Sequence, residues 1–350
     1  MIKVAIFGAG RWGSHLIRNF QHHPQANLVA IADPHADRLQ AAQECCQLPP
    51  EVRLETDWRN VLQIPELDAV VVATPASTHY TIISAALKRG CHVLAENPLT
   101  LKLSESRALC ELAQQCNRQL VIDHTYLFHP AVESGQHIVA KGTLGTLRYG
   151  YATRTHLEPI RQDVDALWDL AIHDIAIFNS WLGQTPVQVQ ATGTVWLQPN
   201  QQFEVSRVSD STPMMNQGLS DLVVATLTYA DGFRAFLHFC WLNPDKQRRL
   251  GVVGSQGTLI FDEMSKVAPL TLQKGYLETV EQGWKGAGQQ QDIVAIANQE
   301  PLAEVCDHFL YCAYHNIPSN RSDGYVATEL IQILSGLSES LQQGGQPILL

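Results

Sequence analysis

A glycine-rich turn near the start of the chain constrains the fold more than any other feature. Gly8, Gly10 and Gly13 form the pattern G-x-G-x-x-G between a short apolar run, Lys3–Phe7, and a segment of helical periodicity, Trp12–Phe20. In a strand–turn–helix unit, the first glycine makes a tight turn, the second lets the backbone approach a pyrophosphate and the third permits close helix packing. The pattern therefore predicts a dinucleotide site, although three glycines can also do no more than turn a loop.

Strands and helices alternate over the first third of the chain. Five runs rich in β-branched residues are expected as strands: Lys3–Phe7, Leu28–Ala32, Ala69–Ala73, His92–Ala95 and Gln119–Ile122. Helical periodicity is expected between them, over Trp12–Phe20, Asp37–Cys46, Thr78–Arg89 and Ser104–Asn117. This alternation is typical of an α/β protein with a parallel sheet covered on both faces. We expect a Rossmann dinucleotide-binding domain over residues 1–123.

The pattern changes after residue 123. Helices are expected near 131–141 and over Leu167–Leu182, and the final residues 302–342 are helical. Strands are expected at Arg148–Arg154, Leu222–Tyr229, Phe233–Trp241 and Arg249–Val253, with Asp231-Gly232 as a hairpin turn. The Gln- and Gly-rich residues 282–291 are expected to form an exposed loop. Residues 124–350 therefore form a predicted α+β domain with an open, largely antiparallel sheet.

Composition excludes several classes of function. The 350 residues carry 24 Lys and Arg against 34 Asp and Glu, a net charge of -10, and no basic run that would suggest a nucleic-acid partner. The eight cysteines form no Cys-x-x-Cys pair, so we expect reduced thiols. Apolar runs fall short of the roughly 18 residues of a membrane span, and no signal-peptide pattern is present. We expect a cytoplasmic protein with no membrane partner.

An acidic residue ends the second predicted strand. Asp33 lies 20 positions after Gly13, where an acid accepts hydrogen bonds from the adenosine ribose and repels a 2′-phosphate. NAD is therefore favoured over NADP, although Arg11 and Arg38, which with Trp12 are expected near the cofactor, weaken this preference. The alternative is that Asp33 only initiates a turn with Pro34.

Ligands in open α/β sheets bind at the carboxyl ends of the strands. Two further strand ends therefore predict cofactor contacts on the nicotinamide side. The residues concerned are Thr74, Pro75 and His79 after one strand, and Glu96, Asn97 and Pro98 after the next.

These motifs, taken with three later ones, resemble those of the Gfo/Idh/MocA family of NAD(P)-dependent oxidoreductases. The later motifs are Tyr126 to Pro130, Trp168 to Asp174 and Arg321 to Gly324, and the resemblance spans nearly the whole chain. Within the family, the second of them, together with Trp241 to Pro244 and Val253 to Ser255, resembles members that act on nucleotide-linked sugars, especially the UDP-N-acetylglucosaminuronate 3-dehydrogenase type. The resemblance implies hydride exchange between nicotinamide and a carbinol or ketone carbon of a sugar, sugar acid, nucleotide sugar or cyclitol. It also implies a homodimer or homotetramer built through the second domain's sheet.

The resemblance places two catalytic residues in the second domain. Asp169 and His173 match the family's aspartate and histidine, and residues four apart share a helix face. An imidazole beside a carboxylate can shuttle a proton near neutral pH. The alternative is that Asp169 caps the helix and His173 is a surface residue. No third ligand of suitable spacing accompanies them, so no metal is expected.

Asn97 departs from the family pattern, which has lysine at this position. A carboxamide donates and accepts hydrogen bonds but cannot act as acid or base. Three explanations remain open: a dehydrogenase in which Asn97 orients nicotinamide or substrate and His173 handles the proton, a reductase of a conjugated acceptor resembling biliverdin reductase, or a non-catalytic dinucleotide sensor.

Three further residues are candidates for binding a small-molecule substrate. Tyr126 lies where the chain passes between the predicted domains, while Arg154 and Arg161 precede Asp169. The arginines suit an anionic substrate such as a uronate or a diphosphate, although single loop arginines are often only solvated.

Overall fold

The chain forms two compact units in a computed structural model that describes residues 1–208 and 213–350. The first unit comprises Met1–Phe128 and Gln299–Ile331, and the second comprises His129–Asn298 and Gln332–Leu350. The first unit thus includes a helical segment from near the end of the chain. Helix α9 (Gly324–Gln342) contributes residues to both units.

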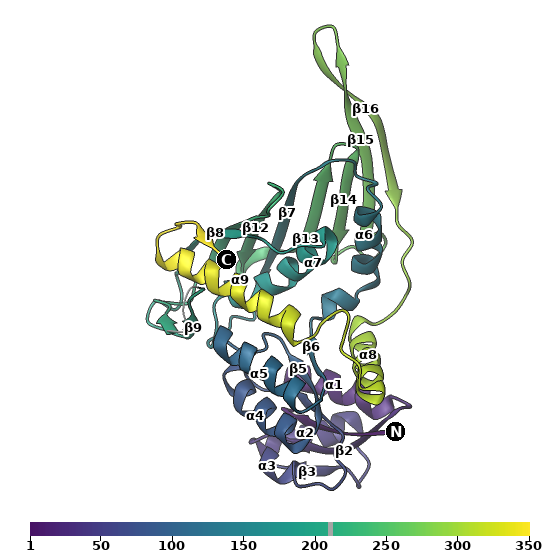
Figure 1. Cartoon of the computed structure of the whole chain (residues 1–350), viewed down its shortest axis with the longest axis vertical. Coiled ribbons are helices and arrows are strands. Elements are labelled where there is room, and N and C mark those ends of the chain that lie inside the picture. The colour runs from purple at the N-terminus through teal and green to yellow at the C-terminus, as the bar shows by residue number, and fades with distance from the viewer. Residues whose placement is uncertain (209–212) are drawn as a thin grey trace. The chain divides into compact units, whose positions relative to one another are not determined.

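A six-stranded parallel sheet forms the centre of the first unit (Figure 1). Its order is β3-β2-β1-β4-β5-β6. The strands are β1 (Ile2–Phe7), β2 (Ala26–Ala32), β3 (Arg53–Glu55), β4 (Ala69–Val72), β5 (His92–Glu96) and β6 (Leu120–Asp123). Most strand residues are buried, as expected where helices cover both faces. The predicted Rossmann architecture is confirmed. The sheet also contains β3, which was not predicted because three residues are too few to show an alternation of apolar and polar side chains.

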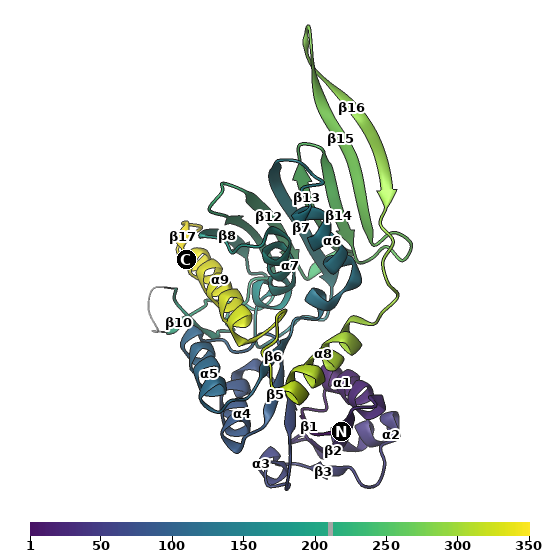
Figure 2. The same ribbon diagram turned by 45° about the vertical axis from the view of Figure 1, so that its right-hand side comes forward.

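Helices connect the strands and cover the sheet. They are α1 (Arg11–His22), α2 (Ala36–Cys46), α3 (Trp58–Val61), α4 (Ala76–Arg89), α5 (Leu103–Gln115) and the 3₁₀ turn η1 (Thr125–Phe128), joined by α8 (Pro301–His315). Figure 2 shows α8 beside α1, and the rings of Phe20 and Phe309 meet edge to face at 6.3 Å between their centroids. The apolar face of α1 is therefore shared between the sheet and α8.

The second unit is built on a nine-stranded mixed sheet. Its order is β16-β15-β14-β13-β7-β12-β11-β8-β17, and only the β7–β12 pair among these described strands is parallel. The strands are β7 (Leu147–Leu157), β8 (Gln188–Thr194), β11 (Leu222–Thr228), β12 (Arg234–Cys240), β13 (Leu242–Gly254), β14 (Gly257–Asp262), β15 (Leu270–Val280), β16 (Gly283–Ile293) and β17 (Ile348–Leu349). A separate pair consists of β9 (Glu204–Ser206) and β10 (Pro213–Met215). The predicted, largely antiparallel sheet is confirmed.

Helices cover one face of this sheet, among them two that belong wholly to the second unit. They are α6 (Pro130–Ala140) and α7 (Ile172–Leu182), and a π-helical turn, η2 (Leu167–Ala171), leads directly into α7 (Figure 1). The approach is close, because a Cβ atom on Gly150 of β7 would meet the Phe178 ring of α7 at 2.5 Å. The opposite face leaves Tyr149, Val224 and Phe236 exposed.

Two expectations from the sequence need correction or refinement. Residues 282–291 are not a loop, since Gly283–Ile293 forms β16, which pairs with β15 in a long hairpin that extends beyond the other strands of its sheet (Figures 1 and 2). Glycine and glutamine have low β propensity, but backbone pairing with β15 overrides it. The final helical stretch is two helices, because Asn316 adopts φ 50° after α8 and Pro318 follows.

The hairpin predicted at Asp231-Gly232 is confirmed between β11 and β12, with Gly232 at φ 87°. Among the residues that the structure describes, no helix combines the length and the apolarity that crossing a membrane requires.

Candidate active site

The three glycines of the loop after β1 have different surroundings. A Cβ atom on Gly8, whose φ is +99°, would overlap the carbonyl oxygen of Ala73, and one on Gly13 would overlap that of Gly8. A Cβ atom on Gly10 would meet no described atom within 4 Å. Packing therefore requires glycine at the first and third positions. The second glycine borders open space, as close approach of a pyrophosphate demands.

The first turn of α1 adds the polarity that an anion needs. Gly10 is the N-cap residue and has no side chain to occupy the free N–H groups of the helix. Arg11 and Trp12 follow as exposed residues, Trp12 with 53% of its surface accessible. An uncapped helix N-terminus beside an open glycine is suited to binding phosphate. The loop therefore fits the dinucleotide that its sequence predicts.

Asp33 connects the end of β2 to this loop. The carboxylate is buried, with Oδ2 accepting from the Ala9 N–H at 2.8 Å and Oδ1 accepting from the His35 N–H at 2.9 Å. A carboxylate has about four acceptor positions, so capacity remains for ribose hydroxyls. The exposed Arg38 places Nη1 at 3.8 Å from Asp33 Oδ2.

The segments after β4 and β5 are tied together by His79. Its Nε2 lies 2.8 Å from the carbonyl oxygen of Thr74, and its Nδ1 lies 3.1 Å from that of Leu99. Thr74 also exchanges a hydrogen bond with Thr78 through their hydroxyls. His79 is buried at 1% exposure, so its ring holds the two segments in place, and Pro75 forms the N-cap of α4 between them.

Asn97 is bound to the backbone of the neighbouring strand. Its Nδ2 donates to the carbonyl oxygen of Asp123 at 2.7 Å, and Glu96 lies opposite Asp123 in the register of β5 and β6. Asn97 precedes a cis peptide bond to Pro98. The carboxamide thus makes a positioning contact at the carboxyl edge of the sheet.

Asp123 is a buried acid at this edge that the sequence patterns did not single out. Its Oδ1 accepts from the Thr125 hydroxyl at 2.7 Å, and its Oδ2 has no hydrogen-bond partner among the described residues. Burial raises its pKa to about 6, against the hydrogen bonds of Thr125. The neighbouring His124 is neutral, because burial lowers its pKa to about 3. The sequence feature that could have identified Asp123 is its position directly after the β-branched run Val121-Ile122, at the end of a predicted strand.

The predicted pair of the second unit lies at the junction of η2 and α7. Asp169 is in the π-helical turn, and His173 is the second residue of α7, each partly buried. Arg161 donates from Nη1 to Asp169 Oδ1 at 3.2 Å. Burial lowers the pKa of Arg161, but the carboxylates of Asp163 and Asp169 outweigh it and raise the pKa, so the guanidinium stays charged.

Two further titratable groups surround Asp169. The buried Asp165 accepts from the Trp168 N–H at 3.1 Å, and burial raises its pKa to about 7. Burial lowers the pKa of His156, although the negative charge of Asp169 opposes this. Neither Oδ2 of Asp165 nor Nε2 of His156 has a hydrogen-bond partner among the described residues. The sequence motifs did not single out Asp165, although it lies four residues before Asp169.

Arg154 lies in β7 and is only 1% exposed. Its Nη2 and Nε donate to the two carboxylate oxygens of Asp174 at 2.7 and 3.3 Å, and its Nη1 lies 3.8 Å from Glu263 Oε2. The guanidinium therefore joins β7 to α7 beside His173. Tyr126, in η1 of the first unit, is partly buried. No three His, Cys, Asp or Glu side chains cluster as metal ligands within residues 1–208 and 213–350.

Comparison with known families identifies both units. The model of an oxidoreductase family with an NAD-binding Rossmann fold matches residues 2–124, and the GFO/IDH/MocA C-terminal domain matches residues 133–260. The chain belongs to the GFO/IDH/MocA oxidoreductase family. The resemblance seen in its motifs is confirmed, and the first unit contains an NAD-binding Rossmann domain.

Two curated members of this family show its range. The chain is 31% identical over 195 residues to a UDP-N-acetylglucosamine 3-dehydrogenase of Acidithiobacillus ferrooxidans, covering 55% of this chain and 58% of that protein. It is 30% identical over 207 residues to a scyllo-inositol 2-dehydrogenase (NAD(+)) of Bacillus subtilis, covering 57% and 59%. The matched region is thus little more than half the length of these two relatives.

Solved structures share the fold over nearly the full chain. A putative oxidoreductase from Magnetospirillum magnetotacticum is 28% identical with a TM-score of 0.76, covering 96% of this chain and 99% of that one. Levoglucosan dehydrogenase in complex with NADH and L-sorbose has a TM-score of 0.79 at 16% identity, covering 99% and 98%. At that identity the likeness concerns the fold alone.

Proposed function

We propose that this chain is an NAD(P)-dependent dehydrogenase or reductase acting on a carbinol or ketone carbon of a sugar, sugar acid, nucleotide sugar or cyclitol. The observation that carries the proposal is the glycine loop, in which Gly8 and Gly13 are required by packing while Gly10 borders open space at a helix N-terminus. Family relatives named as sugar and inositol dehydrogenases support the substrate class.

NAD is the preferred cofactor in this proposal. Asp33 is buried and bound at both oxygens to backbone N–H groups of Ala9 and His35, so its negative charge is fixed beside the loop. A 2′-phosphate would meet this charge, whereas ribose hydroxyls would donate to it. Arg38, at 3.8 Å from Asp33, offsets part of the charge, and NADPH binding is expected to be weaker rather than absent.

The bound nicotinamide supplies the hydride chemistry, and the chain supplies positions for the proton. His173 is the proposed acceptor of the hydroxyl proton in alcohol oxidation, and its donor in ketone reduction. Arg161 holds the Asp169 carboxylate at 3.2 Å, and this carboxylate is the proposed orienting group for the imidazole. Asn97 cannot exchange a proton, and its bond to the Asp123 carbonyl suits a residue that positions its neighbours.

Titration with NADH and NADPH, followed by a screen of UDP-sugars, uronates, inositols and free sugars at the nicotinamide absorbance, tests the proposal. Once a substrate is found, His173→Ala should lower kcat by about 10² to 10⁴ while NADH affinity stays within twofold. His137→Ala, on α6 of the same unit, is the matched control and should leave kcat unchanged. Equal activity in His173→Ala would remove His173 from the mechanism.

A second candidate, a non-catalytic dinucleotide sensor, rests on Asn97. The side chain at the family's lysine position carries no titratable group and is bound to a backbone carbonyl. A sensor would bind NADH tightly, show no turnover across the panel and gain turnover in Asn97→Lys. Bleaching of a tetrapyrrole with NADPH would instead indicate a reductase of a conjugated acceptor.

The proposed enzyme is a homodimer or homotetramer that associates through the open face of the second unit's sheet. Val224, Phe236 and Tyr149, on three adjacent strands, are 42% to 48% exposed, and the Tyr149 and Phe236 rings lie 6.4 Å apart. Such a contiguous apolar patch is typical of an interface. Phe236→Glu should yield monomers by light scattering, whereas Val267→Glu, at an 84% exposed site, should not.

A further inference from the structure

The first unit has a second concave region at the opposite edge of its sheet from the glycine loop. A cavity of about 470 Å³ is lined where strands begin: Ile2 starts β1, His92 starts β5, and Asp68 directly precedes β4. The glycine loop follows the other end of β1, which at about 3.3 Å per residue is roughly 20 Å long. The cavity is therefore separate from the dinucleotide loop.

Two arginines line this cavity, and backbone carbonyls hold both. Arg89 donates from Nε to the Leu62 carbonyl oxygen at 3.0 Å and from Nη2 to that of Ile64 at 3.5 Å. Arg118 donates from Nε to the Gly90 carbonyl and from Nη1 to that of Asn117 at 2.9 Å. These bonds fix the planar side chains before any ligand arrives, which lowers the entropy cost of binding.

Neither arginine is neutralised by a carboxylate. Within the described part of the chain, no ion pair of 4.0 Å or less involves Arg89 or Arg118. Among the described lining residues Asp68 alone carries a carboxylate, and its Oδ2 accepts from the Lys3 N–H at 2.8 Å. Nearby, the Lys3 ammonium is already paired with Glu66 at 2.7 Å. The lining therefore has two guanidinium groups against one carboxylate, in a chain of net charge -10.

His92 adds a neutral donor to the same cavity. Its Nδ1 accepts the Gln119 N–H at 3.1 Å, so a neutral ring carries its proton on Nε2. Burial, and after it the charge of Arg118, lowers the pKa of His92 to about 4, against the opposing charge of Asp68. The ring is neutral at pH 7 and can donate one hydrogen bond from Nε2.

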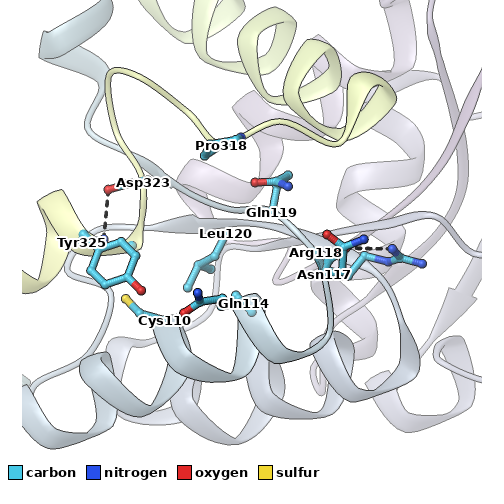
Figure 3. A pocket seen from close by; sticks show the side chains of 11 residues that line it. Cys110, Gln114, Asn117, Arg118, Gln119, Leu120, Pro318, Asp323 and Tyr325 are labelled. Atoms are coloured by element: carbon cyan, nitrogen blue, oxygen red, sulfur yellow. Dashed lines mark hydrogen bonds between the residues drawn. The ribbon is translucent and has the colours of Figure 1, made fainter.

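Arg118 also borders the neighbouring cavity. Figure 3 shows it at the end of that cavity opposite Cys110 and Tyr325. The neighbouring cavity, of about 310 Å³, is lined mostly by amide and apolar side chains with Asp323 as a carboxylate. The positive charge is thus greater in the cavity of about 470 Å³, which both Arg89 and Arg118 line.

We propose that the cavity of Arg89, Arg118 and His92 binds the phosphate group of a small phosphorylated molecule. Guanidinium forks match the tetrahedral, multiply charged phosphate oxygens, and charge-assisted bonds to them are about twice as strong as neutral ones. The volume of about 470 Å³ exceeds what a phosphate alone needs, and the Tyr314 ring, 72% exposed in the lining, offers a surface for the rest of the molecule. This site does not depend on the proposed dehydrogenase activity.

Inorganic phosphate is the probe for the test, titrated at constant ionic strength into protein saturated with NADH so that the glycine loop is occupied. Saturable binding is expected by calorimetry, together with an upward shift of the His92 pKa by NMR. Arg89→Gln and Arg118→Gln should each weaken binding about tenfold or more. Arg107→Gln removes one exposed guanidinium from α5 outside the cavity and should leave affinity unchanged.

Arg118→Lys serves as a second variant, because it keeps the positive charge but loses the paired N–H donors of the guanidinium. Thermal unfolding without phosphate checks that each variant is folded. A folded Arg118→Lys protein should bind phosphate with intermediate affinity. Absence of saturable binding to the wild type, equal weakening in Arg107→Gln, or unchanged affinity in both Arg89→Gln and Arg118→Gln would overturn the proposal. Phosphate binding that NADH abolishes would place the phosphate in the dinucleotide loop and would equally overturn it.

Discussion

The two units hold their candidate site residues by different means. In the first unit the loop after β1 depends on the absence of side chains, with Gly8 and Gly13 packed against backbone and Gly10 left open. In the second unit, charged side chains such as Arg154 and Asp174 fix the start of α7 from inside the protein. A site made of backbone is visible in a local sequence pattern. A site made of paired charges depends on which strands and helices meet.

The largest effect on stability is expected at the buried ion pair of the second unit. Asp174→Asn removes the carboxylate that accepts from Nη2 and Nε of the Arg154 guanidinium, a side chain that is only 1% exposed. Removing one member of a buried pair costs about 3–5 kcal/mol. We expect urea unfolding to show a loss of this size.

The double variant Arg154→Met with Asp174→Leu is the control, because it removes both charges and fills a similar volume. It should recover most of the lost stability. If Asp174→Asn is as stable as the wild type, the pair does not fix α7, and Arg154 becomes available for the substrate contact that its sequence position suggested.

A smaller but more specific effect is expected in the glycine loop. In Gly13→Ala the new Cβ overlaps the Gly8 carbonyl, so the backbone must shift at a cost of about 1–3 kcal/mol. Gly10→Ala meets no described atom and should cost less than about 1 kcal/mol. Fluorescence titration should nevertheless show NADH binding at least tenfold weaker in Gly10→Ala. Unchanged NADH affinity in that variant would contradict the proposed position of the pyrophosphate.

The sequence predicted the first unit's fold closely, because short β-branched runs alternate with helical periods and each run became a buried strand. The sequence wrongly predicted a loop where β16 lies. Gly283, Gly286 and Gly288 have low strand propensity, and the strand forms because its backbone pairs with β15. Nothing in the sequence indicated that α8, from residues 301–315, packs on α1. Such contacts arise between segments nearly 300 residues apart, and no local pattern encodes them.

Some residues of the candidate site could likewise be predicted from the sequence, whereas the properties of others depend on the fold. Gly10 and Asp33 were predicted from spacing, and the structure joins them through the Ala9 N–H. The burial of Arg154, by contrast, follows from the position of Asp174 across the sheet and helix, 20 residues away. Asp123 and Asp165 acquire their raised pKa values from burial, which the sequence around each does not reveal.

A pH dependence of stability is expected from Asp165. Its pKa is about 7 in the folded chain, raised by burial, and near 4 when unfolded. Its stabilising contribution is therefore fully present below pH 4 and is lost as the pH rises through 7. About 2 kcal/mol of this loss falls between pH 5 and pH 7. Asp165→Asn should remove this part of the slope in urea unfolding between pH 5 and pH 8. Asp123, with a pKa of about 6, contributes a slope of the same sign that remains in the variant.

The smallest effect is expected at an ion pair that, unlike Arg154–Asp174, is exposed to solvent. Lys274 and Asp292 join β15 to β16 at 2.7 Å, with 43% and 36% of their side chains exposed. Solvent screens such a pair, so Lys274→Ala should cost less than about 1 kcal/mol and less again in 1 M salt. A loss near that of Asp174→Asn would mean that the hairpin pair is shielded from solvent by another molecule. The comparison of buried and exposed charges within one sheet thereby also reports whether the hairpin stands free in solution.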